Sequence, residues 1–246
     1  MEGKLYGVGV GPGDPELLTM KGLRLICEAD VIAVPGREAR KSVAYQTAEQ
    51  AAALAGEKIQ NIFAEKELLS VPMPMEKDET KLAKAHDEGA ELIRKHLDKG
   101  KMVVFLTLGD PTVYSTYLYL HRRLTKTGYS TELVSGVPSF CSAAARLNMG
   151  LVERAEPLHV IPASYSLEVS EEFEKAVHLP GTKVLMKSGK CMKDVKEKLL
   201  KEEADIYMIE NCGMKEEKIY TSAEQIPDNS SYYFLIIMKD RMKSEG

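Results

Sequence analysis

The chain has 246 residues, of which 44% are hydrophobic and 28% charged, a balance that is typical of globular proteins and excludes a disordered one. Its formal net charge is -4 and no basic stripe runs along it, so nucleic acid is not expected as its main partner. No apolar run approaches the length of a membrane span, which argues against a membrane partner.

The four cysteines and five histidines are scattered, without a C-x-x-C pair or another spacing typical of metal ligands. We therefore expect no metal bound by the protein itself. Scattered thiols fit a reducing compartment, which predicts a cytoplasmic protein.

The first predicted element is a strand over Lys4–Val10 that runs into a loop with alternating glycines: Gly7, Gly9, Gly11 and Gly13. Alternating glycine removes the side chains from the end of a strand, so we expect something to come close to the backbone there, as at the small-molecule site of an α/β protein. The alternative is a tight strand-to-helix turn that binds no ligand. Asp14 and Pro15 then predict a helix start, as N-cap and first helical residue. The loop is not a dinucleotide fingerprint, because Pro12 or Asp14 stands where G-x-G-x-x-G needs its third glycine.

Strands and helices alternate along the rest of the chain, which predicts an α/β architecture. The clearest helix is expected from Asp78 to Lys99, where Gly100 ends it. Nine strands would be many for one sheet, so we expect two lobes, residues 1–127 and 128–246, with a soft boundary near residues 125–130. The other strand candidates are Asp30–Val34, Glu57–Ile62, Met102–Leu106, Thr131–Val134, Leu158–Ile161, Thr182–Met186, Ile206–Glu210 and Tyr232–Met238.

A second candidate site follows the buried strand at residues 102–106, where the sequence reads LGDPTVYSTY. Gly109 permits a ligand to come close, and Asp110 stands where a strand end opens into the crevice that binds ligands in α/β sheets. Its carboxylate suits ribose hydroxyls or an amino group. Alternatively, Asp110 caps the following helix with Pro111 at its first position, and the two roles are compatible. Three tyrosines on that helix face a ligand or pack between lobes: Tyr114, Tyr117 and Tyr119.

Two further regions are weaker signals. In SGVPSFCSAAARL, Pro138 and Ser139 lie at a strand-to-helix turn, before small residues that allow close helix packing. The segments at 184–190 (VLMKSGK) and 208–217 (MIENCGMKEE) are strands ending in polar, glycine-containing turns that could close a pocket.

Taken together, GVGVGPGDPELLT, GDPTVYSTY, SGVPSFCSAAARL and ENCG resemble the tetrapyrrole (corrin/porphyrin) methylases in order and spacing. The resemblance covers nearly the whole chain. Within that family, GDPTVYSTYLYLHRRL and PSFCSAAARL are most similar to the precorrin-2 / cobalt-factor II C-20 methyltransferases.

The resemblance implies a two-lobed α/β fold, each lobe a mostly parallel or mixed sheet flanked by helices, with S-adenosylmethionine bound between the lobes and S-adenosylhomocysteine as product. Carried over by position, the cofactor-binding residues are Pro12, Leu108, Gly109, Asp110, Val113, Pro138, Ser139, Met186, Cys212 and Phe234, with Tyr233 beside the last. The chain departs from the family pattern at Pro138, where serine or threonine is usual, and at Cys212, where alanine or glycine is usual.

The implied reaction is methyl transfer to C-20 of precorrin-2 or cobalt-factor II in cobalamin biosynthesis. The ring carbon is itself nucleophilic, so positioning is the main task of the protein and a base removes only the C-20 proton. The base is not identified: Tyr114 is a candidate, and a substrate carboxylate or water would also serve. Arg37 is the candidate cation for the ring carboxylates, with an ordinary solvated loop residue as the alternative. The substrate is assigned to Gly11, Asp14, Arg37 and Tyr114.

The resemblance also implies a homodimer.

Three other functions remain open. They are a tetrapyrrole methylase acting at another carbon, such as the uroporphyrinogen III enzyme, a methylase of the same fold acting on a modified histidine or on ribosomal RNA, and a non-catalytic protein that binds S-adenosylmethionine or a tetrapyrrole.

Overall fold

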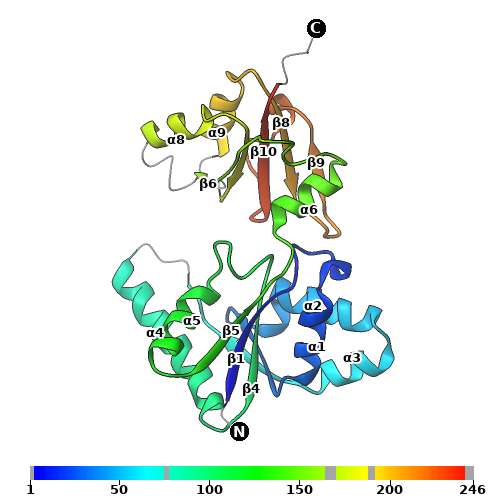
Figure 1. Cartoon of the computed structure of the whole chain (residues 1–246), viewed down its shortest axis with the longest axis vertical. Coiled ribbons are helices and arrows are strands. Elements are labelled where there is room, and N and C mark those ends of the chain that lie inside the picture. The colour runs from blue at the N-terminus through cyan, green and yellow to red at the C-terminus, as the bar shows by residue number, and fades with distance from the viewer. Residues whose placement is uncertain (1–2, 75–77, 164–169, 188–191, 242–246) are drawn as a thin grey trace. The chain divides into compact units, whose positions relative to one another are not determined.

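The computed structural model describes residues 3–74, 78–163, 170–187 and 192–241 of an α/β protein. The chain forms two compact units, residues 1–138 and 139–246. Each is built on a five-stranded sheet (Figure 1). The division differs from the expected boundary at residues 127–128, because β5 (Ser130–Val134) pairs with β1 (Lys4–Gly9) in the first sheet. Among the described residues, no helix is both long and apolar enough to span a membrane.

The sheet of the first unit is wholly parallel, in the order β3-β2-β4-β1-β5. Its remaining strands are β2 (Val31–Pro35), β3 (Glu67–Val71) and β4 (Met102–Thr107). Strand β1 pairs on one side with β4 and on the other with β5, so that Gly7 lies opposite both Phe105 and Leu133. Because all five strands run the same way, their carboxyl ends meet at a single edge of the sheet.

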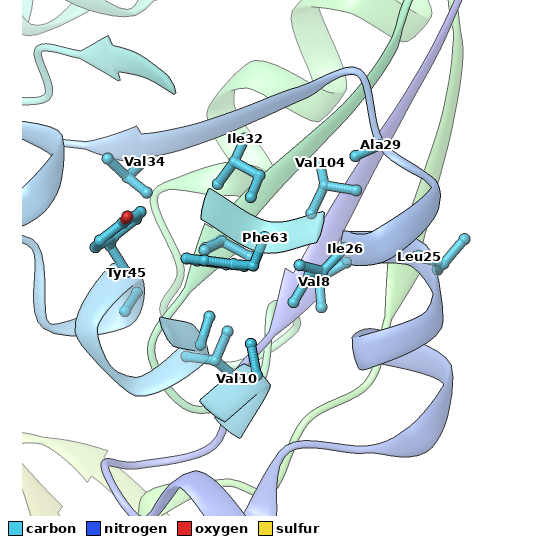
Figure 2. Packing of buried hydrophobic residues seen from close by; sticks show 14 of the residues in the cluster. Val8, Val10, Leu25, Ile26, Ala29, Ile32, Val34, Tyr45, Phe63 and Val104 are labelled. Atoms are coloured by element: carbon cyan, nitrogen blue, oxygen red, sulfur yellow. The ribbon is translucent and has the colours of Figure 1, made fainter. Parts of the chain in front are cut away.

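Helices cover both faces of this sheet, as Figure 1 shows. On one face lie α1 (Met20–Glu28), α2 (Val43–Leu54) and α3 (Glu57–Ala64), and on the other α4 (Glu79–Leu97) and α5 (Tyr117–Lys126). The alternation of side chains along β4 supplies both cores: Val104 packs with α1 to α3 (Figure 2), whereas Phe105 packs with α4 and α5. The helix expected over residues 78–99 is thus confirmed as α4, with Asp78 as its N-cap.

Two expectations about this unit are wrong. Residues 57–62 are not a strand but part of α3, because Ile59 and Phe63 lie one helical turn apart and both pack against the α1 to α3 core. The strand of this region is β3, a few residues later. The helix expected directly after Asp14 is only a 3-10 turn, Pro15–Leu17, and α1 begins at Met20 with Thr19 as its N-cap.

The second unit has a mixed sheet in the order β6-β7-β10-β8-β9. Its strands are β6 (Leu158–Pro162), β7 (Thr182–Met186), β8 (Ala204–Glu210), β9 (Lys218–Tyr220) and β10 (Phe234–Asp240). The short β9 was not expected from the sequence. β10 runs antiparallel to both of its neighbours, β7 and β8.

One face of the second sheet is covered by α6 (Ser139–Arg146), and the other by α8 (Ser170–Val177) and α9 (Met192–Leu199). β10 serves both cores, since Ile236 packs with α8 and α9 while Leu235 packs with α6. Between β7 and β10 the ammonium of Lys183, which is 1% exposed, pairs with Asp240 and donates a hydrogen bond to the carbonyl of Leu179 at 3.0 Å.

Candidate active site

The carboxyl edge of the first sheet brings together the glycine loop and the turn after β4. The N–H of Gly109 donates to the carbonyl of Gly11 at 2.7 Å, and the N–H of Gly11 donates to the carbonyl of Gly109 at 3.3 Å. This reciprocal pair sets Pro12 and Leu108, which are next in sequence, at the same edge. Four predicted cofactor positions, Pro12 and residues 108–110, therefore lie on two turns that are hydrogen-bonded to each other.

The alternating glycines of β1 are explained by the chain itself. A Cβ added at Gly7 would lie 2.1 Å from the ring of Tyr117, and one added at Gly9 would lie 2.5 Å from the carbonyl oxygen of Gly109. A Cβ at Gly136, in the turn after β5, would lie 2.3 Å from that same oxygen. The close approach expected from the sequence is real, and at Gly7 and Gly9 the approaching groups are this ring and two backbone turns.

Asp110 ties these turns together and is only 6% exposed. One carboxylate oxygen accepts the N–H of Thr112 at 2.7 Å and also its hydroxyl. The other accepts the N–H of Gly136 at 2.9 Å. The alternative role of Asp110 as a helix cap is wrong, because α5 does not begin until Tyr117 and the carboxylate caps a tight turn instead.

The turn between β4 and α5 is supported by a buried hydrogen bond and contains one residue with an unusual backbone conformation. The hydroxyls of Thr107 and Ser115, both buried, lie 2.9 Å apart. The N–H of Val113 donates to the carbonyl of Asp110 at 3.2 Å. Tyr114 has a φ of 48°, a left-handed conformation that is uncommon for a bulky aromatic residue and clusters at functional sites. Its side chain is 43% exposed.

The three tyrosines of this region do not form one cluster. Tyr117 is fully buried, packs against Phe105, and donates its hydroxyl to the carbonyl of Glu132 at 3.0 Å. Tyr119 stacks on His86 of α4, with ring centroids 4.3 Å apart. Of the three, Tyr114 alone precedes the helix on the turn at the sheet edge.

The residues assigned to the substrate lie on loops that leave the carboxyl ends of three strands: Gly11 and Asp14 after β1, Arg37 after β2 and Tyr114 after β4. Asp14 accepts the N–H of Glu16 at 2.9 Å and so caps the 3-10 turn. Arg37 is exposed. The structure thus puts all four at one edge of the sheet.

In the second unit, three predicted cofactor residues also meet at one sheet edge. β7 ends at Met186, β8 ends just before Cys212, and β10 begins between them at Phe234. The N–H of Asn211 donates to the carbonyl of Tyr233 at 2.7 Å, which closes this edge. Burial raises the pKa of Tyr233, with the neighbouring Tyr232 adding to the effect, so its hydroxyl stays neutral at physiological pH.

Two further predicted cofactor residues lie where the chain passes from the first unit to the second. Pro138 is the last residue of the first unit, and Ser139 is the first residue of α6 in the second. In the turn predicted at residues 184–190, Lys187 has a φ of 59° and burial lowers the pKa of its ammonium group. Residues 188–190 lie outside the described residues, as does Cys191.

Sequence reasoning missed the carboxylate at the end of β8. Glu210 is 4% exposed and accepts the N–H of Ser231 at 2.7 Å and the hydroxyl of Tyr220 at 3.0 Å. Its signal was available, because a charged residue directly after an apolar strand must find partners when it is buried. Elsewhere in the described chain, no group of three or more His, Cys, Asp or Glu side chains is arranged to hold a metal ion.

Comparison with known proteins gives a consistent result. The family profile of the Tetrapyrrole (Corrin/Porphyrin) Methylases matches residues 4–227. The chain is 34% identical over 222 residues to a probable cobalt-precorrin-2 C(20)-methyltransferase of Methanocaldococcus jannaschii, covering 88% of this chain and 86% of the relative. It is 27% identical over 257 residues to a precorrin-2 C(20)-methyltransferase of a Sinorhizobium species, covering 97% of each.

Among solved structures, the chain is similar to the uroporphyrin-III C-methyltransferase of Thermus thermophilus, crystallised with S-adenosyl homocysteine. The TM-score is 0.66 at 22% identity, and the match covers 96% of this chain and 97% of the other. At that identity the likeness concerns the fold.

Proposed function

This chain belongs to the tetrapyrrole (corrin/porphyrin) methylases, and from that premise we propose that it transfers a methyl group from S-adenosylmethionine to C-20 of precorrin-2 or cobalt-factor II in cobalamin biosynthesis. The observation that carries this proposal is the match, over most of the chain, to relatives named as C(20)-methyltransferases of precorrin-2 and cobalt-precorrin-2. Methyl transfer as such follows from the family. The ring carbon and the substrate are the proposal.

In the first unit, we assign the cofactor to the turns at the carboxyl edge of the sheet. The bare backbone of that edge supports this assignment: a Cβ added at Gly109 would have nothing within 4 Å. A ligand can therefore reach the backbone of this turn, while Gly9 and Gly136 hold the turn from the other side. In the second unit, the proposed contacts are Met186, Cys212 and Phe234.

S-adenosylmethionine supplies an electrophilic methyl group on a sulfonium, and the attacking carbon belongs to the tetrapyrrole. What remains for this chain is to hold the two in line. We propose that the hydrogen-bonded turns around Asp110 fix the cofactor side and that Arg37 pairs with ring carboxylates. The C-20 proton passes to water or to a substrate carboxylate, and Tyr114, which lies at the same edge on a turn with a left-handed backbone, is the candidate side chain for assisting that transfer.

We further propose that the protein works as a homodimer in the cytoplasm on a small-molecule tetrapyrrole, without nucleic acid or membrane as a partner. The net charge of -4 supports the exclusion of nucleic acid. Light scattering after gel filtration measures the oligomeric state, and a molar mass of a single chain would contradict the dimer.

The test of the reaction is an anaerobic incubation with S-adenosylmethionine and either metal-free precorrin-2 or cobalt-factor II, followed by mass spectrometry and NMR. One added methyl group, with its carbon signal at C-20, is the expected product. The preferred substrate then shows whether cobalt is inserted before or after this step. A parallel incubation with S-adenosylhomocysteine is the control, because that molecule has no methyl group to give.

Other outcomes would replace the proposal. A methyl group at a different carbon, or transfer to uroporphyrinogen III instead, would move the chain to another member of the family. Tight binding of S-adenosylmethionine without transfer to any tetrapyrrole would favour a binding protein.

A further inference from the structure

The turn at residues 211–217, directly after β8, is held by a carboxylate that the sequence motifs do not single out. Glu217 closes this turn by accepting the N–H of Gly213 at 2.7 Å. It also receives the guanidinium of Arg146, whose Nε lies 3.0 and 3.2 Å from its two oxygens and whose Nη2 donates to Oε1 at 2.5 Å. The side chain of Glu217 is 13% exposed and that of Arg146 is 57% exposed, so the carboxylate is largely removed from solvent while the guanidinium reaches it from the surface.

The turn also has hydrogen bonds of its own, which give it a defined shape. Asn211 and Gly213 have φ values of 51° and 76°, both in the left-handed region. Three hydrogen bonds close the loop on itself: Met214 N–H to the carbonyl of Asn211, Glu217 N–H to the carbonyl of Met214, and the Asn211 side chain to the carbonyl of Glu216. Asparagine and glycine adopt this conformation more readily than other residues, and these three bonds stabilise it here.

Helix α6 contacts this turn at two points. The hydroxyl of Ser142 lies 3.5 Å from the sulfur of Cys212, which is 7% exposed. Arg146 is four residues further along α6, on the same face as Ser142, and reaches Glu217. Ser139, at the start of α6, lies three residues before Ser142 and shares that face. The helix that begins with one proposed cofactor residue therefore fixes the turn that contains another.

We propose that Glu217 and Arg146 are positioning residues for S-adenosylmethionine, which hold the turn at residues 211–214 against α6 and so set the place of Cys212. This inference rests on the proposed function and extends it to two residues that act on the cofactor through the backbone of a turn. Neither side chain is assigned a contact with the tetrapyrrole. The role is therefore expected to show in cofactor affinity and not in the Michaelis constant of the tetrapyrrole.

The test is Glu217→Gln, which keeps the size of the side chain and one acceptor oxygen but removes the negative charge that pairs with Arg146. The Kd of S-adenosylmethionine in calorimetry and its KM are expected to rise about tenfold, as for the loss of one charge-assisted hydrogen bond. The kcat and the KM of the tetrapyrrole are expected to stay within about twofold of wild type. Arg146→Lys keeps the positive charge but loses the planar guanidinium that bonds both oxygens of Glu217. It is expected to raise the Kd of S-adenosylmethionine less than Arg146→Ala does.

The matched control is Glu174→Gln, which removes one carboxylate from the same unit, where Glu174 pairs with Lys198 across α8 and α9. Its affinity for S-adenosylmethionine is expected to equal that of wild type. Circular dichroism at the assay temperature shows which variants are folded, and Arg146→Lys serves if Glu217→Gln is not. A folded Glu217→Gln with wild-type affinity would overturn the positioning role. A wild-type protein that neither binds nor consumes S-adenosylmethionine would instead overturn the proposed function, and the inference with it.

Discussion

The carboxylate of Asp110 accepts a hydrogen bond from the backbone N–H of Gly136 at 2.9 Å, and this bond joins the turn after β4 to the turn after β5 across the end of β1. The two strands are not neighbours in the sheet, since β1 lies between them. The side chain therefore spans the strand that carries the glycine loop.

Asp110→Asn tests this bridge. An amide has one acceptor oxygen, so its NH₂ group would face the N–H of either Gly136 or Thr112, and a buried donor would lose its partner. We expect the free energy of unfolding in urea to fall by about 1–3 kcal/mol and the Kd of S-adenosylmethionine to rise. Asp87→Asn, at an exposed carboxylate paired with Arg123, is the control. Unchanged cofactor affinity in a destabilised variant would limit Asp110 to a structural role.

Gly9→Ala tests how closely the three turns approach. The added methyl group would lie 2.5 Å from the carbonyl oxygen of Gly109 and 2.8 Å from the Cα of Gly136, and neither backbone atom can move cheaply. Overpacking of this kind costs about 1–3 kcal/mol or more, so thermal unfolding should occur at a clearly lower temperature. Gly150→Ala is the matched control, because its nearest neighbour would be a side-chain oxygen of Glu153 at 3.5 Å. Equal melting temperatures for the two variants would contradict the close approach.

His86 predicts a dependence of stability on pH. Burial, and to a lesser degree the charge of Arg123, lowers the pKa of His86 below its usual value. The unfolded chain therefore binds this proton more readily than the folded one. The stabilisation is complete above the ordinary histidine pKa of about 6.5 and is lost as the pH falls through the lower pKa of the folded state.

The variant His86→Phe keeps an aromatic ring against Tyr119 but cannot take up the proton. Urea unfolding of this variant, followed from pH 8 to pH 5, should lose less stability on acidification than wild type. His178→Gln, at a histidine whose side chain is 61% exposed, is the control for the loss of a histidine as such. A His86→Phe curve parallel to that of wild type would show that another group causes the acid sensitivity.

The ion pair of buried Lys183 and half-exposed Asp240 predicts an asymmetry between its two partners. Asp240→Ala leaves an ammonium group that is 1% exposed without its carboxylate, at a cost on the order of 3 kcal/mol. Lys183→Met removes the buried charge and leaves Asp240, whose side chain is 50% exposed, able to meet water. Denaturant unfolding should therefore rank Asp240→Ala as the less stable variant, and the reverse order would show that the ammonium of Lys183 is not removed from solvent.

The sequence predicted well what depends on neighbouring residues. The continuous apolar run at residues 102–106 indicated a buried parallel strand, and β4 is central in such a sheet. Residues 57–62 could not be assigned from so short a segment, because Ile59, Ile62 and Phe63 fit a strand as well as one face of a helix. The packing of Phe63 against the first sheet decides for the helix, and that packing is not local.

The candidate site was predictable in place but not in its contacts. The glycines and Asp110 correctly marked a crowded strand edge, yet their partners, Tyr117 and Gly136, are distant in sequence. The same holds for Glu217, whose partner Arg146 lies 71 residues earlier. Glycine and asparagine in a turn motif predict the conformation of that turn. They do not predict which helix will pack against it.

The position of β10 affects the order in which the two units can fold during synthesis. All strands of the first sheet have been synthesised by residue 134, so that unit can fold while the ribosome is still extending the chain. The second sheet must wait for residues 234–240, because they form the strand that lies between β7 and β8. A nascent chain halted before that point would carry a finished first unit followed by two strands with open edges, which is the state most exposed to aggregation and to proteolysis.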